Sequence, residues 1–83
     1  MTAKDTIINF YLVDVHTLYA REYYFGVVSG YYIDKCTNGE ITEEELEEKL
    51  DYLEGKKAIQ LQRIAYELRR KSVMELGYVK EYG

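Results

Sequence analysis

The segment from Thr6 to Ile33 limits the possible folds most, because only three of its side chains carry a full charge. These three are Asp14, Arg21 and Glu22. Apolar and aromatic residues fill most other positions, so a helix built from this segment would be apolar all round and would have to be buried. The rest of an 83-residue chain can cover only part of such a helix. We therefore expect its uncovered side to meet another chain.

The secondary structure of this apolar half has two interpretations. Thr6–Val13 and Tyr23–Val28 are rich in strand formers, which allows an α+β fold with an N-terminal β-hairpin packed on C-terminal helices. A helix is favoured by Asp5 as an N-cap and by apolar residues at helical steps from Ile8 to Tyr19. No two-residue hairpin turn separates the two runs, and the chain has no proline. We therefore predict one long apolar first helix.

The second half has clearer helical signals. Thr42 and Glu45 can form a capping box, and apolar residues recur after it at steps of three and four. Gly55 either kinks one long helix or divides it into two, and Gly77 is expected to end the last helix. The predicted fold is all-α, a helical hairpin or a small three-helix bundle in a single domain of residues 1–83. Its parts are an apolar half (5–35), a turn (36–41), a charged helical half (42–77) and a frayed tail (78–83).

The composition indicates the cellular compartment of the protein and argues against one class of partner, nucleic acids. The formal net charge of -4 argues against a general nucleic-acid binder, which usually carries a basic excess. Cys36 is the only cysteine, so an internal disulfide is excluded and a reducing compartment is favoured. No signal peptide is evident, and the uncharged stretch Tyr23–Ile33 is too short to span a bilayer. We expect a cytoplasmic protein with no membrane segment.

The sharpest local pattern runs from Asp34 to Glu45, with Asn38 at its fifth position and Gly39 at its sixth. It resembles an EF-hand calcium loop, in which oxygen ligands at such spacings surround the ion and the glycine allows a sharp bend. The resemblance implies a calcium site at Asp34, Asn38 and Glu45. Cys36 departs from the pattern, because a thiol is a poor calcium ligand. The alternative is helix punctuation, in which a helix-ending glycine and a capping box give nearly the same string and no cofactor is bound.

The sequence shows no recognisable arrangement of catalytic residues, and we expect no enzymatic activity. His16 is the only histidine, and no nucleophile or acid is evidently placed beside it. Cys36 has Lys35 as its only neighbouring activating group. A basic cluster at Arg69–Lys71, preceded by Arg63, leaves a nucleic-acid-associated factor as an alternative. Such residues also complement the negative end of a helix dipole.

The chain has ten tyrosines and no tryptophan. Each buried hydroxyl needs a hydrogen-bond partner, so a half-buried interface accounts for many tyrosines better than an internal core does. Two glycines four residues apart would form a smooth strip where a second backbone can approach. We predict a homodimer formed through the first helix. The predicted interface residues are Tyr11, Tyr19, Tyr23, Tyr24, Gly26, Gly30, Tyr31 and Tyr32.

Carboxylates crowd the start of the second half. A surface of this kind can select a basic partner protein by electrostatic complementarity, although it can also be a solvated helix face. We expect a small non-enzymatic interaction module, a regulator or inhibitor of bacterial or phage type, that docks on a partner protein. The predicted acidic docking face consists of Glu43, Glu44, Glu47, Glu48 and Asp51.

Overall fold

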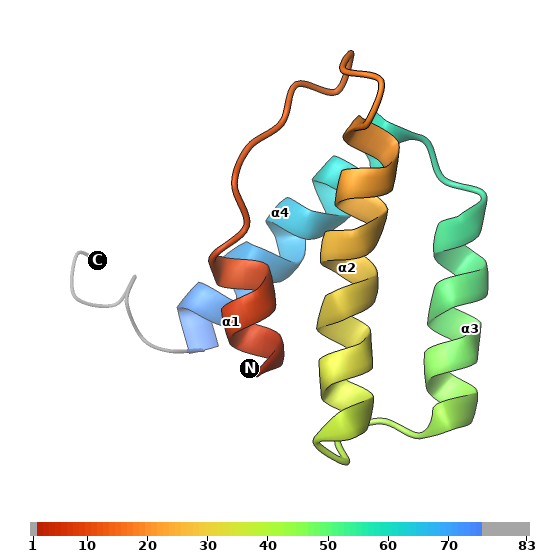
Figure 1. The fold of residues 1–83 in the computed structure, drawn as a ribbon. Helices are drawn as coiled ribbons and strands as arrows, with labels where there is room; N and C mark the ends of the chain where they lie inside the picture. Colours follow the sequence, from red (N-terminus) through yellow and green to blue (C-terminus); the bar gives the residue numbers. More distant parts are fainter. Residues whose placement is uncertain (1, 76–83) are drawn as a thin grey trace.

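The computed structural model describes residues 2–75, which form four helices and no strands. The all-α prediction is confirmed, and the β-hairpin alternative is not found in this part of the chain. The helices are α1 (Ala3–Ile8), α2 (Ala20–Thr37), α3 (Glu43–Glu54) and α4 (Ala58–Glu75) (Figure 1).

The predicted first helix is divided in the structure, because residues 9–19 form a loop between α1 and α2. Thr2, rather than Asp5, is the N-cap of α1, and Asp5 completes a capping box with it. Asn9 ends α1, since its backbone N–H and its side-chain amide each donate to the Asp5 carbonyl oxygen at 3.1 Å. The division supplies a separate short helix that covers part of α2.

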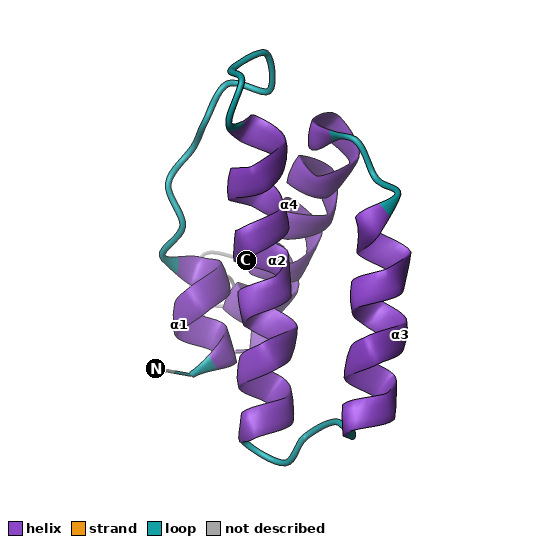
Figure 2. Ribbon diagram, turned by 45° about the vertical axis from the view of Figure 1, so that its right-hand side comes forward, coloured by secondary structure: helices purple, strands orange, loops and turns teal. Residues whose placement is uncertain are grey.

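Helix α2 is the central element of the fold. Helices α1 and α4 pack on α2 and on each other, and α3 packs on α2. Figures 1 and 2 show α1 and α3 on opposite sides of α2. The buried core contains Tyr24 and Val28 of α2 together with Ile7 of α1, Leu61 of α4 and Leu53 of α3. The apolar half is therefore covered largely from within the chain.

The turn between α2 and α3 follows the helix-punctuation interpretation. Asn38 is the C-cap of α2, and Gly39 adopts a left-handed φ of 78° that favours glycine. Thr42 and Glu45 form the predicted capping box at the start of α3. Gly55 is the C-cap of α3, so the second half contains two helices.

Arg21 ties the turn between α3 and α4 to the start of α2. Its guanidinium donates to the backbone oxygen of Glu54 and, at 2.9 Å, to that of Lys56. The Glu54 oxygen belongs to the last residue of α3, where helix carbonyls lack partners, and Lys56 follows the C-cap Gly55. The predicted end of the last helix at Gly77 and the predicted tail at 78–83 lie outside the described residues. Within residues 2–75, no helix is long and apolar enough to cross a membrane.

The two glycines of α2 provide a matched test of this packing. A Cβ added at Gly26 meets nothing within 4 Å, whereas one added at Gly30 lies 3.2 Å from Thr6 Cγ2. We expect Gly26→Ala to raise the free energy of unfolding by about 0.5–1 kcal/mol, because alanine loses less backbone entropy in a helix. Gly30→Ala should gain less, because Thr6 must shift. Urea denaturation measures both, and an equal or larger gain at position 30 would contradict the α1–α2 contact.

Candidate functional site

Two neighbouring tyrosines of α2 hold the 9–19 loop in place. The Tyr23 hydroxyl accepts from the Tyr11 backbone N–H at 2.9 Å and donates to the Tyr11 carbonyl oxygen at 2.7 Å. The Tyr24 hydroxyl does the same for Val13, at 2.9 and 2.5 Å. The two side chains thus satisfy the backbone of alternate loop residues, as the neighbouring strand of a sheet would. The backbone from Tyr11 to Val13 is therefore fixed, although it belongs to no helix or strand.

Tyr24 belongs to the core, which corrects its prediction as an interface residue. Its side chain is fully buried, and its ring meets Phe10 edge to face at a centroid distance of 6.3 Å. Gln62 Nε2 donates to its hydroxyl at 3.1 Å, so the hydroxyl has three partners. The expectation that so many hydroxyls exceed what a core can satisfy is wrong for this residue, because loop and α4 groups supply those partners.

The other predicted interface residues fall into three groups. Tyr31 is buried and Gly30 packs against Thr6, so neither is available to a second chain. Tyr23 and Tyr32 are half-buried, and the former stacks on Tyr11 at a centroid distance of 4.5 Å. The predicted residues that are exposed are Tyr11, Tyr19 and Gly26.

Four large apolar side chains stand exposed on the loop, and we call them the loop surface. Tyr11 is 68% exposed, Leu12 64%, Leu18 92% and Tyr19 69%. The sequence prediction included the two tyrosines and missed the two leucines, which fit the helical steps of a buried face. No local signal distinguishes them, because their exposure follows from the division of the helix.

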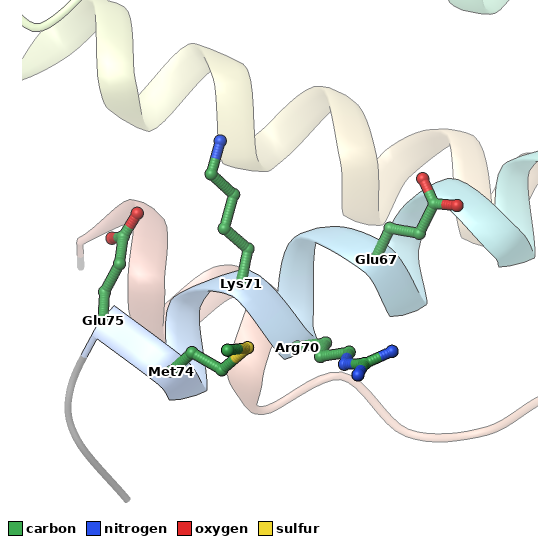
Figure 3. Close-up of a pocket in the computed structure, with 5 residues that line it drawn as sticks. All are labelled: Glu67, Arg70, Lys71, Met74 and Glu75. Atoms are coloured by element: carbon green, nitrogen blue, oxygen red, sulfur yellow. The ribbon is translucent and has the colours of Figure 1, made fainter. Parts of the chain in front are cut away.

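A hollow of about 420 Å³ lies on the surface of α4, and the described residues that line it all belong to that helix. Figure 3 shows Arg70 and Lys71 extending from it in different directions. A smaller hollow of about 280 Å³ lies beside the loop surface, between α1 and α2. Phe10, Tyr11 and Tyr23 are among the residues that line it. This second hollow adjoins the loop surface and could receive an apolar side chain.

The three predicted calcium ligands have other roles in the fold. Asp34 accepts a hydrogen bond from the Thr6 hydroxyl, and Glu45 accepts from the Thr42 backbone N–H at 3.3 Å. The backbone N–H of Asn38 donates within the C-terminal turn of α2. Residues 2–75 bring together no group of three or more His, Cys, Asp or Glu side chains that could hold a metal ion. These contacts are the ones that helix punctuation predicts for this segment.

The charged surfaces lie on different helices. The five residues of the predicted acidic docking face are all exposed along α3. Arg63, Arg70 and Lys71 are exposed on α4, whereas Arg69 is half-buried with its guanidinium carbon 5.3 Å from the centroid of the Phe10 ring. Arg69 therefore packs on the core and is not a free member of the basic cluster.

Comparisons of the chain with protein-family models, curated proteins and solved structures found no match.

Replacing Tyr24 with phenylalanine tests whether its hydroxyl anchors the loop. Tyr24→Phe would leave the backbone groups of Val13 without a partner, so we expect the free energy of unfolding to fall by about 1–3 kcal/mol. Tyr11→Phe is the matched control, since the Tyr11 side chain is exposed, and its effect should stay within about 0.5 kcal/mol. Chemical denaturation measures both, and equal effects of the two substitutions would contradict the anchoring role.

Alkaline pH should weaken the fold through the half-buried tyrosines. Burial raises the pKa of Tyr23 above the ordinary 10.0, although the hydrogen bond to the Tyr11 backbone opposes this shift. Burial likewise raises the pKa of Tyr32. The folded state therefore favours the protonated phenols, and their stabilisation is complete below about pH 10 and is lost as pH rises through the folded-state pKa. Denaturation at pH 8–11 should show falling stability, with a shallower fall for Tyr23→Phe; equal slopes would argue against a role of Tyr23.

Proposed function

We propose that this protein is a small non-enzymatic interaction module, a regulator or inhibitor, that binds a partner protein through the loop surface. The supporting observation is that four large apolar side chains, 64–92% exposed, project from a loop whose backbone is held at Tyr11 and Val13 by hydrogen bonds to α2. Scattered single apolar residues are normal on protein surfaces, but apolar surface that gathers on one segment marks interaction sites more often.

The fixed loop backbone favours binding at low entropic cost. Binding surfaces that are already ordered lose less conformational freedom when a partner docks. Two of the four exposed residues are tyrosines, and aromatic residues are enriched at the centres of protein interfaces. The hollow between α1 and α2 adjoins Tyr11 and offers space for an apolar side chain of the partner.

The acidic face on α3 adds selectivity to this proposal. Its carboxylates are exposed and the chain carries a net charge of -4, so a basic partner would approach faster than an acidic one. The non-enzymatic part of the proposal draws on the separation of the reactive side chains. His16 precedes α2, whereas Cys36 lies in its last turn.

The proposal is tested by capture of partner proteins from the cell that encodes the chain. The bait is the wild-type chain or the double variant Leu18→Ser, Tyr19→Ser, which removes apolar area from residues that lie outside the core. We expect the double variant to lose the captured protein. Tyr52→Ser is the matched control, because Tyr52 is similarly exposed at 59% but lies on α3. Equal capture by wild type and the double variant would exclude the loop surface as the binding site.

A further inference from the structure

The backbone of Leu12 faces the opposite way from the groups that the tyrosines bind. In an extended chain, the N–H and C=O groups of residues i and i+2 point to one edge and those of residue i+1 to the other. Tyr11 and Val13 both direct these groups to hydroxyls of α2. Leu12 therefore presents its backbone donor and acceptor on the outer edge, where no hydrogen bond to any described residue is formed.

This outer edge has the chemistry of an exposed strand. An unpaired strand edge is a template for pairing with another extended segment. Leu12 is 64% exposed, so solvent reaches this residue. The occupant must bring one donor and one acceptor at matching spacing, which a residue of a second extended backbone provides.

A second copy of this chain meets those requirements better than a free peptide. Two Leu12 residues related by a twofold axis pair in antiparallel fashion, and each donates to the other. In each copy the backbone beside Leu12 is already held by Tyr23 and Tyr24. Pairing therefore costs less conformational entropy than the binding of a free peptide, which must become ordered.

The charge distribution also favours a second copy at this loop. The only fully charged residue between Phe10 and Tyr19 is Asp14, and its carboxylate accepts from the His16 backbone N–H at 2.8 Å. Two chains of net charge -4 can therefore meet here with little repulsion, whereas contact through two acidic α3 helices would be opposed.

We infer that the protein forms a twofold-symmetric dimer in which the Leu12 backbones of two copies exchange a pair of hydrogen bonds. In this pairing Tyr11 of each copy lies opposite Val13 of the other. The inference rests on the proposed function, because it names a second copy as an occupant of the loop surface. This dimer differs from the one predicted from the sequence, which used a long first helix. The fold divides that helix into α1 and α2. The contact is short, which places the dimer among weak, transient associations.

Substitution of Leu12 by proline is the direct test. Leu12→Pro removes the outward N–H and leaves the groups that bind Tyr23 and Tyr24 in place. We expect sedimentation velocity from about 10 μM to about 2 mM to show a reversible wild-type dimer, with dimerisation weakened about tenfold or more in Leu12→Pro. Leu12→Val is the matched control, because it keeps the N–H, and it should dimerise within about threefold of wild type.

A second measurement on the wild-type chain keeps the test valid if Leu12→Pro unfolds. Hydrogen exchange of the Leu12 amide should slow as protein concentration rises, because pairing protects it. A wild-type chain that is monomeric at about 2 mM overturns the inference, and so does exchange at Leu12 that is independent of concentration. Loop-dependent capture of a different protein by such a monomer would support the proposed function while the dimer fails.

Discussion

The hydroxyl of Tyr24 is the group on which the arrangement of the chain depends. A phenol that is fully buried must find hydrogen-bond partners within the protein, because water cannot reach it. Val13 and Gln62 supply those partners, so one side chain of α2 is bound to both the 9–19 loop and α4. Helical continuation through the loop would direct the Val13 backbone to its own helix and leave the phenol O–H without its acceptor, with Gln62 as the remaining partner. The loop conformation and the core packing therefore stabilise each other.

The division of the apolar half changes where surplus apolar surface lies. A single helix from residue 5 to 35 would leave a whole side uncovered and would need a second chain along it. In the structure α1 packs against α2 and α4. The core residues of α2 are buried by the other three helices, which all pack on α2. Exposed apolar surface lies instead on the 9–19 loop, where Leu18 is 92% exposed. The exposed apolar surface that a partner would bind therefore lies on a loop and not on a helix face.

The segment from Asp34 to Glu45 combines an EF-hand-like spacing with the signals that end one helix and begin the next. Gly39 has the positive φ of a helix-ending turn, and Thr42 with Glu45 caps the next helix. A helix-ending glycine followed by a capping box reproduces much of the EF-hand spacing. An EF-hand loop and a turn between two helices both need a sharp bend followed by the start of a helix. Asp34 meanwhile bonds to Thr6, which lies far away in the sequence. That long-range contact could not be predicted from the motif itself.

The sequence by itself determined the elements whose signals are local. The capping box at Thr42 and the helical period after it follow from interactions between residues a few positions apart, so they are visible without a structure. Whether Gly55 kinks one helix or divides it into two is not visible in this way. Which tyrosines are buried, and where the first helix divides, only the tertiary structure decided. Tyr11 and Tyr24 look alike in the sequence, yet one is 68% exposed and the other is fully buried. The difference arises because the hydroxyl partners of Tyr24 lie 11 and 38 residues away, and only the packing of the helices brings them together.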